Sequence, residues 1–600
     1  MPRKLTLVGV LAIAAVALVT YFPILGIGFY LDDWAYLDAL NQLGPARFVA
    51  SFINPTIHAY YTGNLRPLFA LSFASQQWLF GTNAVGYHAV LVLLHLANSL
   101  LLCVNTWQVS LNRRVGIMAG LYYATLPVIS GSVFLPTAAD VQAVFFVLLA
   151  FWFWWIYLRT RSKWHYAGTL VVFVLGLSTK ESVVTLPAIL FLEDWLLVRE
   201  KLTPMSLFRR YLGFVIVLLL YMPLLLNMQP GNLFATTYGM SIGIHVLTNA
   251  IQYLAKLTFP WNLDVPFFWT LIAVAIYVFV LVAKRSALLL FLGIAAILGI
   301  IPVLGFQRTL FSPRFLYQSG TVSAVLLAML IENGWRTLGQ RTGRLALVAL
   351  ATVILLLTGM NGVAQAAQEQ LDDARAHRTP FRDISQQHPT FPNDTFLYFI
   401  DSPISLRELS GMFLVRYGQA VTVAGTGKVA QLRDHRNVFV YFFDDTRKPI
   451  EVAVQKDAVT NAAPALPAVF DGTIELEGYE ISANSLKQGE NLVVLLYWRA
   501  LQKIDKDYTV FAHLVDRDGN TVAAVDSQPA GSKVPTTSWW VNAPVVDWVI
   551  LPITQDVPAG ENYRLDIGLY YLPTMQRLSV VDARNMPPTD QISIESFEIQ

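Results

Sequence analysis

Apolar residues in the first 360 positions occur in long stretches that short polar loops separate. A helix that spans a bilayer needs about 20 mostly apolar residues. The stretch that follows Pro2-Arg3-Lys4 is long and precedes no small-residue cleavage site, so we interpret it as an uncleaved helix. The pattern predicts about 11 transmembrane helices, at 5–25, 86–107, 115–134, 138–158, 164–179, 182–198, 210–227, 266–283, 286–305, 314–333 and 344–361.

The pattern changes after residue 361. Residues 362–384 are charged and lack β-branched runs, which predicts a helix that leads out of the membrane. The apolar runs 395–400 and 437–443 precede turn residues and predict buried strands. The Ala/Pro stretch 461–468 is typical of a linker. We therefore expect three parts, a transmembrane domain at 1–361, a small mixed α/β region at 362–465 and a further domain at 466–600.

The last part alternates apolar and polar residues with the period of a strand. In YRLDIGLYYL, for example, Leu565, Ile567 and Leu569 share one face, and Asp518-Gly519-Asn520 is a hairpin turn signal. Eight short segments of this kind predict an antiparallel β-sandwich or jelly roll. The segments are TIELEGYEIS, NLVVLLYWRAL, YTVFAHLVD, TVAAVDS, WVILPITQDV, YRLDIGLYYL, RLSVVD and QISIESFEI.

The composition supports a chain with a membrane part and a water-soluble part. Apolar residues make up 55% and charged residues 14%, against about 25% charged in an ordinary soluble protein. The segment 1–360 has 22 basic and 10 acidic residues, whereas 361–600 has 20 and 30. No long basic run is present, so we expect no nucleic acid partner. The single cysteine, Cys103, excludes an intramolecular disulfide.

The distribution of basic residues predicts the orientation. Alternate loops between the predicted spans hold sixteen and six Lys and Arg residues. The positive-inside rule then places the N-terminus in the cytoplasm and, after an odd number of spans, residues 362–600 outside. The parity requires that 246–262 does not cross, so we interpret it as an interfacial or re-entrant helix. We expect a multi-pass protein of a plasma membrane.

Ionisable residues at the outer ends of the predicted spans are candidates for function, because such groups are costly at membrane depth. Adjacent carboxylates repel each other unless a site uses one of them, which draws attention to Asp32 and Asp33. Lys180 and Glu181 fit a local ion pair as well as a site, and His88 fits helix packing as well as a ligand. The outer set comprises Asp32, Asp33, Tyr61, Arg66, His88, Asp140, Lys180, Glu181, Arg308 and Arg314.

Five motifs in order carry a family resemblance. They are GFYLDDWAYL after the first span, NLRPLFALSFASQQWLFGTNAVGYHAVLVLLHLANSLLL at 64–102, LPVISGSVFLPTAADVQAVFF at 126–146, STKESVVTLPAIL at 178–190 and SPRFLYQSG at 312–320. The chain resembles the GT-C-type glycosyltransferases that use polyprenyl-phosphate sugars, within the protein O-mannosyltransferase-like branch. It departs from the tetratricopeptide members of that branch because 361–600 has no 34-residue repeat.

The resemblance implies an inverting, mannosyltransferase-like enzyme that moves a sugar from a polyprenyl-phosphate donor to a protein, lipid or glycan acceptor outside the membrane. Asp32 then serves as general base, with Asp33 as the alternative, and Asp140 and Glu181 orient the acceptor, the base or an ion. The resemblance leaves open whether a divalent cation, Mg²⁺ or Mn²⁺, takes part. Arg66, Lys180, Arg308, Arg314 and Tyr317 would contact the donor phosphate, and Tyr61 and His88 the substrate.

Two other classes of function remain open from the sequence. Outward-facing charges also suit a lipid or glycan transporter or flippase, although the chain shows no internal symmetry. A non-catalytic surface protein that binds carbohydrate through its β-sandwich is the other alternative. For that role Trp539-Trp540 or Tyr570-Tyr571 would stack on sugar rings, although aromatic residues in a sandwich usually pack in its core.

Overall fold

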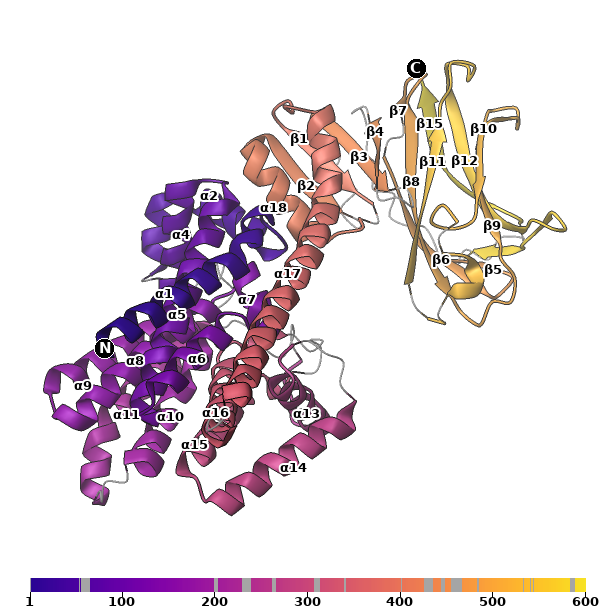
Figure 1. The fold of residues 1–600 in the computed structure, drawn as a ribbon. Coiled ribbons are helices and arrows are strands. Elements are labelled where there is room, and N and C mark those ends of the chain that lie inside the picture. Colours follow the sequence, from indigo (N-terminus) through magenta and orange to yellow (C-terminus); the bar gives the residue numbers. More distant parts are fainter. Residues whose placement is uncertain are drawn as a thin grey trace. The chain divides into compact units, whose positions relative to one another are not determined.

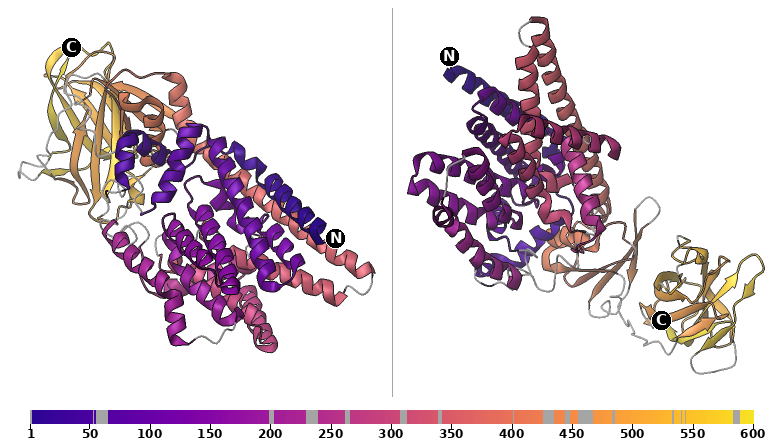
Figure 2. Two further views of the ribbon diagram at one scale, coloured as in Figure 1. Left: turned by 90° about the vertical axis from the view of Figure 1, so that its left-hand side faces the viewer. Right: turned by 90° about the horizontal axis from the view of Figure 1, so that it is seen from below.

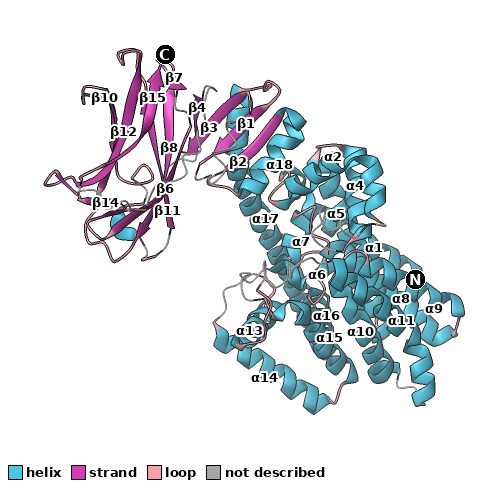
Figure 3. Ribbon diagram, turned by 180° about the vertical axis from the view of Figure 1, so that it is seen from behind, coloured by secondary structure: helices cyan, strands magenta, loops and turns pink. Residues whose placement is uncertain are grey.

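A computed structural model describes the chain except for residues 1, 53, 55–64, 199–202, 229–238, 262–265, 307–312, 339–341, 401, 426–434, 444–447, 455–466, 483–484, 533, 540, 543 and 583–588. It divides into two compact units, Met1–His377 and Arg378–Gln600. The first unit is helical and the strands belong to the second, as the colours of Figure 3 show. The sequence-based prediction of a helical membrane part followed by a β-rich part is confirmed.

Helices of the first unit occupy the predicted spans, and α2, α4 and α13 lie outside them (Figure 1). Short turns join several of them, namely η1 Phe22–Gly26, η2 Pro127–Ile129, η3 Glu181–Thr185, η4 Asp194–Val198 and η5 Pro313–Leu316. The helices are α1 Pro2–Tyr21, α2 Asp32–Ser51, α4 Pro67–Phe80, α5 Ala84–Ser110, α6 Arg113–Tyr123, α7 Ser130–Phe134, α8 Asp140–Thr160, α9 Lys163–Leu177, α10 Leu186–Glu193, α11 Pro204–Met228, α13 Ile244–Thr258, α14 Phe267–Lys284, α15 Ala287–Leu304, α16 Gly320–Leu338 and α17 Thr342–Gln387.

Six helices in the described part of the chain are long and apolar enough to cross a membrane by length and composition. A seventh span results if the bent pair formed by α6 and by η2 with α7 counts as one. Helices also occupy the other predicted spans, but α9 has 15 residues, α10 has 8, and α16 carries Glu332 and Arg336. The predicted span 115–134 is not straight, because it bends by 55° at the break before Pro127.

The core of the first unit forms where α5, α6, α8 and α16 pack against one another. The views of Figure 2 show the helices of this unit bundled together. The long helix α17 packs against the bend between α6 and η2. A Cβ on Gly359 would lie 2.5 Å from the Thr125 carbonyl oxygen, so this close approach requires glycine. Val363, Ala367 and Ala374 continue the buried face of α17. The helix runs without a break through the predicted boundary at 361/362.

The second unit begins with a small α/β sheet after α17. Its strands are β1 Thr395–Phe399, β2 Val421–Gly425, β3 Asn437–Phe443 and β4 Pro449–Val454, in the order β2-β1-β3-β4. Strand β1 pairs in parallel with β2 and β3, and helix α18 (Leu406–Tyr417) connects β1 to β2. All five side chains of β1 are buried, which confirms the strands predicted from the apolar runs.

The remaining strands form two sheets around one core (Figure 1). One sheet has the order β10-β9-β12-β15-β7 with β13 beside β12, and the other has the order β11-β8-β6-β5-β14. Strand β15 therefore lies between β12 and β7. The bounds are β5 Ala468–Phe470, β6 Ile474–Ile481, β7 Ser485–Leu486, β8 Asn491–Ala500, β9 Thr509–Val515, β10 Thr521–Ser527, β11 Pro544–Pro552, β12 Gly560–Tyr571, β13 Gln576–Arg577, β14 Val580–Asp582 and β15 Ile592–Ile599.

The alternating pattern correctly predicts the core of the sandwich. Leu565, Ile567 and Leu569 on β12 are fully buried. Trp539 is also buried, at 6% exposure, and its indole Nε1 donates a hydrogen bond to the Val534 carbonyl oxygen at 3.0 Å. Packing therefore accounts for Trp539, whose ring is not presented to a sugar, and Trp540 lies outside the described residues.

Candidate functional site at the ends of the helices

The two adjacent aspartates differ in burial. Asp33 is fully buried, whereas Asp32, the first residue of α2, is exposed. The Asp33 carboxylate accepts hydrogen bonds from the Tyr30 backbone N–H at 3.0 Å, from the Thr137 backbone N–H at 3.1 Å and from the Thr137 hydroxyl at 2.8 Å. Asp33 thereby joins the start of α2 to the loop that precedes α8.

Electrostatics and backbone geometry separate the two aspartates further. Burial raises the pKa of Asp33 to about 7, although the hydrogen bonds from Thr137 and Tyr30 oppose the shift. Leu31, directly before Asp32, has φ 51°, in the left-handed region that a leucine seldom adopts. Such backbone strain persists only where the surroundings hold it. Here Asp33 holds the turn, and the turn presents Asp32 at the surface.

Two ion pairs neighbour this turn. Lys180 Nζ lies 2.5 Å from Asp140 Oδ1, and the two side chains are 10% and 12% exposed. Arg66 binds Glu181 through two hydrogen bonds, Nε to Oε2 at 3.0 Å and an Nη to Oε1 at 2.7 Å. Bidentate pairing of this kind is strong and directional. The local ion pair that the sequence suggested between Lys180 and Glu181 is thus replaced by two long-range pairs.

The backbone explains why these residues meet. The Ser178 carbonyl oxygen at the end of α9 accepts hydrogen bonds from the N–H groups of Leu68 and Phe69 in the first turn of α4. This contact places Arg66 beside Glu181, which follows α9 by a few residues. Since Asp140 begins α8 and Thr137 precedes it, the Asp33 turn belongs to the same cluster.

The pairing also governs the pKa values of this loop. Burial would raise the pKa of Glu181, but the Arg66 guanidinium and its hydrogen bonds outweigh burial and lower it to about 2. Burial lowers the pKa of Lys180, and Asp140 opposes that shift. Glu181 is therefore an ionised partner of Arg66 at neutral pH, and it is not available to take up a proton.

Arg314 neighbours Lys180 because both cations pack against the Phe315 ring. The Phe315 ring centroid lies 5.1 Å from the Arg314 guanidinium and 5.4 Å from Lys180 Nζ, so both cations neighbour one ring. The Ser132 hydroxyl on α7 donates to the Arg314 carbonyl oxygen at 2.8 Å and holds η5 in place. In the described part of the chain Arg314 forms no ion pair, and its buried Nε has no hydrogen-bond partner.

Two predicted contact residues lie deeper in the bundle. Tyr317 is fully buried, and its hydroxyl lies 2.7 Å from His95 Nδ1 and 3.1 Å from the Asn98 side-chain nitrogen that donates to it. His88 is fully buried too, with Nε2 3.1 Å from the Gly28 carbonyl oxygen. Both side chains hold neighbouring elements together. Tyr61 and Arg308 lie outside the described residues.

The structure therefore gathers Asp32, Asp33, Arg66, Asp140, Lys180, Glu181 and Arg314 at connected turns. Sequence reasoning missed Thr137 and Phe315, which connect these charges. Thr137 follows Pro136 directly in the loop before α8, and Phe315 follows Arg314 directly. Their positions beside predicted site residues were the available signal.

The described residues do not fit a metal site at this cluster. They contain no group of three or more His, Cys, Asp or Glu side chains placed to hold one ion. Asp140 and Glu181, the natural oxygen ligands, are each engaged with a cation. Both oxygens of Asp33 already accept hydrogen bonds. We therefore assign no step to a metal, and the participation of a divalent cation stays open, as the sequence left it.

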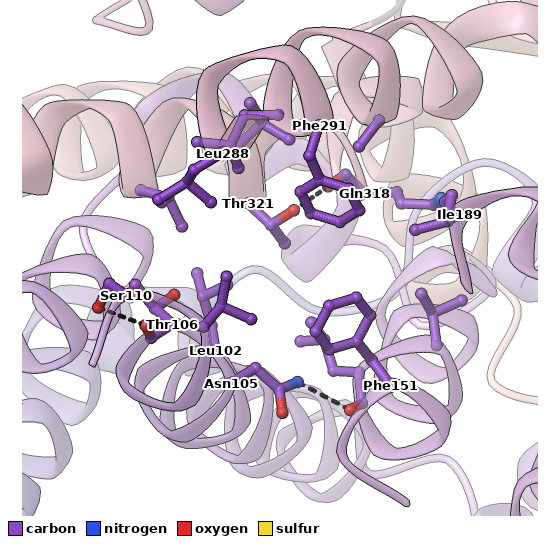
Figure 4. A pocket seen from close by; sticks show the side chains of 17 residues that line it. Leu102, Asn105, Thr106, Ser110, Phe151, Ile189, Leu288, Phe291, Gln318 and Thr321 are labelled. Atoms are coloured by element: carbon purple, nitrogen blue, oxygen red, sulfur yellow. Dashed lines mark hydrogen bonds between the residues drawn. The ribbon is translucent and has the colours of Figure 1, made fainter. Parts of the chain in front are cut away.

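An apolar pocket lies between α5, α8, α10, α15 and α16 (Figure 4). Leu102, Phe151, Leu288 and Phe291 are among its lining residues, and Figure 4 shows the two phenylalanine rings facing each other across it. On α8 the lining begins at Val147, seven residues after Asp140. At 1.5 Å per residue this is about 10 Å along the helix axis from the charged cluster.

Comparisons with known proteins give partial matches. No family model matches the chain. The Protein O-mannosyl-transferase Tmtc1 of Drosophila melanogaster is 29% identical over 193 residues, which are 30% of this chain and 22% of that relative. The chain thus spans less than a quarter of the length of the curated relative it matches. This sequence match confirms the resemblance to protein O-mannosyltransferases that the motifs predicted.

A solved structure is also similar. ArnT from Cupriavidus metallidurans, crystallised with bound undecaprenyl phosphate, aligns with a TM-score of 0.48 and 14% sequence identity, over 73% of this chain and 93% of ArnT.

Proposed function

We propose that this chain is a membrane glycosyltransferase that transfers a sugar from a polyprenyl-phosphate donor to a hydroxyl acceptor on the outer side of the membrane. The partial match to a protein O-mannosyl-transferase supports the reaction class. The observation that carries the proposal is the chain of contacts from the Asp33 turn through Thr137 to α8, and from Asp140 through Lys180 and Phe315 to Arg314. It connects an exposed carboxylate to a cation that lacks a carboxylate partner in the described part of the chain.

In the proposed reaction Asp32 accepts the proton of the acceptor hydroxyl as its oxygen attacks C1 of the sugar. The bond between C1 and the phosphate oxygen breaks, and the electron pair leaves with the polyprenyl phosphate. A single displacement of this kind inverts the configuration at C1. A general base must first lie within hydrogen-bond reach of the proton it accepts, and its pKa is considered second. Asp32 meets the first requirement because it is exposed to an incoming acceptor, whereas Asp33 is buried. Asp33, whose two oxygens already accept hydrogen bonds, acts as a positioning residue.

Arg314 stabilises the leaving phosphate, since a cation placed where negative charge develops lowers the barrier. Lys180 assists through the N–H groups that Asp140 does not occupy. Arg66 and Glu181 neutralise each other and serve to hold the first outer loop against η3. The apolar pocket between α5, α8 and α16 has the lining and the position to hold the polyprenyl chain of the donor.

The test is transfer by the purified full-length protein from a panel of polyprenyl-phosphate sugars, with and without a chelator. We expect Asp32→Asn to reduce the turnover rate at least 100-fold, in the range of general-base catalysis, with unchanged thermal stability. Asp38→Asn removes the same charge from α2, six residues away, and is the matched control, with less than a twofold effect. An Asp32→Asn protein with more than a tenth of wild-type activity would refute the base, and no transfer from any donor would refute the function.

A further inference from the structure

A second charged region lies at the opposite end of α8. An open pocket is lined by Tyr157, Arg161, Lys163, Tyr166, Thr203, Met205, Ser206, Arg209 and Arg210. Helix α8 runs from Asp140 to Thr160, and its 21 residues span about 32 Å. The pocket is therefore about one bilayer thickness from the charged cluster described above, and the mechanism makes no use of it.

The walls of this pocket come from helices that pack unusually closely. A Cβ on Gly213 of α11 would lie 2.7 Å from the Tyr166 hydroxyl on α9, so a larger residue at 213 would displace the Tyr166 side chain. The Tyr166 hydroxyl donates to the Arg210 carbonyl oxygen at 3.0 Å. Arg210 is itself buried against Asp194, with Nη1 2.5 Å from Oδ2. Packing and this buried pair fix the back of the pocket.

The opening of the pocket carries an excess of positive charge. Arg210 is neutralised by Asp194, but Lys163 and Arg209 are exposed at the opening, and no carboxylate is among the lining residues that the structure describes. The first turns of α9 and α11 also contribute to the lining, through Lys163 and Ser206. Helix N-termini present N–H groups and a partial positive charge to anions. Cations, hydroxyl groups and two helix N-termini thus face one cavity.

The surroundings of the opening are apolar. Trp164 is 86% exposed, and Met205 and Phe208 are each 58% exposed. The two membrane-spanning candidates that end here, α8 and α11, place these side chains at a membrane surface. Exposed aromatic and apolar side chains beside cations are typical of the headgroup level of a bilayer. A soluble anion would not need this apolar rim.

We propose that this pocket binds the phosphate group of an anionic phospholipid in the leaflet opposite the charged cluster. Basic residues are generally in excess on a cytoplasmic face, but such an excess would leave them scattered. It does not explain why cations from two separate parts of the chain line one cavity. Arg159, from the same end of α8, is instead placed over the Trp155 ring at 4.6 Å and does not line the pocket. The binding is independent of sugar transfer.

The test is titration of the full-length protein in detergent with phosphatidylglycerol, with bound lipid counted by native mass spectrometry. Lys163→Ala/Arg209→Ala removes two exposed cations and leaves the buried Arg210 pair intact. At about 1 kcal/mol for each basic residue near a lipid headgroup, we expect the dissociation constant to rise about 30-fold. Lys284→Ala/Arg285→Ala is the matched control, since it removes two exposed cations of another loop, and we expect less than a twofold change.

Two arms identify the source of the phosphate. Zwitterionic phosphatidylcholine should bind no differently to the two double variants, and inorganic phosphate at millimolar concentration should displace little phosphatidylglycerol from the wild type. Equal loss of lipid in both double variants would overturn the proposal in favour of general surface charge. Pocket-dependent binding of inorganic phosphate without pocket-dependent binding of the lipid would overturn the assignment to a lipid.

Discussion

Glu181 in the helical unit and Asp547 in the sandwich are shielded carboxylates with different partners. In the helical unit, Arg66 meets Glu181 with two hydrogen bonds and holds the pKa of that carboxyl at about 2. In the sandwich, Asp547 is 1% exposed and accepts hydrogen bonds only from neutral donors among the described residues, the Ala530 and Trp548 backbone N–H groups at 2.7 Å and the Trp498 indole at 3.3 Å.

The pKa of Asp547 shifts in the opposite direction to that of Glu181. Burial raises the pKa of Asp547 to about 6, and its neutral donors oppose that shift only in part. A cationic partner therefore commits a buried carboxylate to its charged form, whereas neutral donors leave it able to take up a proton in mild acid. The first arrangement keeps Glu181 ionised in the charged cluster, whereas Asp33 in that cluster has neutral donors and a raised pKa like Asp547. The second arrangement joins β8 and β11 to the loop at Ala530.

The largest effect should come from breaking the paired arrangement. Glu181→Gln leaves the Arg66 guanidinium without its carboxylate in a mostly buried place, and loss of one partner of a buried pair costs about 3–5 kcal/mol. We expect the lower end of that range because the side chains are 15% and 20% exposed. The measurement is thermal unfolding of the helical unit in detergent.

The control for this variant is an exposed pair. Asp372→Asn breaks the contact of Asp372 with Arg375, whose side chains are 60% and 63% exposed, and pairs of that kind contribute little. If Glu181→Gln lowers the unfolding temperature no more than Asp372→Asn, the ion pair does not hold the loop.

A smaller effect is expected for pH in the sandwich. The folded state binds a proton at Asp547 more tightly than the unfolded state does, since the pKa is about 6 against the ordinary 3.8. The contribution of this group to stability is thus fully present below pH 4 and is lost as pH rises through 6. Its limit is about 3 kcal/mol, at about 1.4 kcal/mol per pH unit.

Comparison with Asp547→Asn isolates this contribution. The difference in free energy of unfolding between wild type and variant should change between pH 4 and pH 6 and stay constant above pH 7. Amide hydrogen exchange of β8 and β11 in the full-length protein, corrected for the intrinsic pH dependence of exchange, measures it. A constant difference across the whole range would mean that Asp547 titrates as an ordinary aspartate.

Arg314 lies outside the ion pairs of the cluster. Its loss should have the smallest effect on stability and a clear effect on binding of the donor. Arg314→Ala should raise the dissociation constant for the donor about 10-fold, because a charge-assisted hydrogen bond to phosphate is lost, while the unfolding temperature stays the same. Arg47, an exposed cation of α2 on the predicted outer side, provides the control variant Arg47→Ala. Unchanged donor affinity in Arg314→Ala would remove Arg314 from the phosphate site without bearing on the ion pairs.

The helices and strands were predictable because buried positions recur along the sequence as apolar residues with a regular spacing. Apolar runs predicted helices at every proposed span, and alternation predicted the strands of the sandwich with their inward side chains, such as Leu565. The bend of 55° between α6 and α7 was not predicted, although Pro127 lies at the break. A proline in an apolar run permits a bend without setting its angle.

The candidate site was predictable in its charges and not in its connections. The acidic and basic residues stand out because they interrupt apolar sequence. Their partners do not, since the pairing of Asp33 with Thr137 joins residues 104 positions apart and nothing distinguishes that threonine in the sequence. For the same reason the sequence could not tell that the Tyr317 hydroxyl lies in the core with His95 and Asn98.

The place of β15 inside its sheet has a consequence for how the protein is made. Its residues Glu598 and Ile599 pair with Ser485 and Leu486, more than 110 positions earlier, and its other edge pairs with β12. The sheet therefore stays open at two edges until residue 599 has left the ribosome. Contacts of such long sequence separation form slowly. The sandwich can therefore complete this sheet only after its last strand has been synthesised.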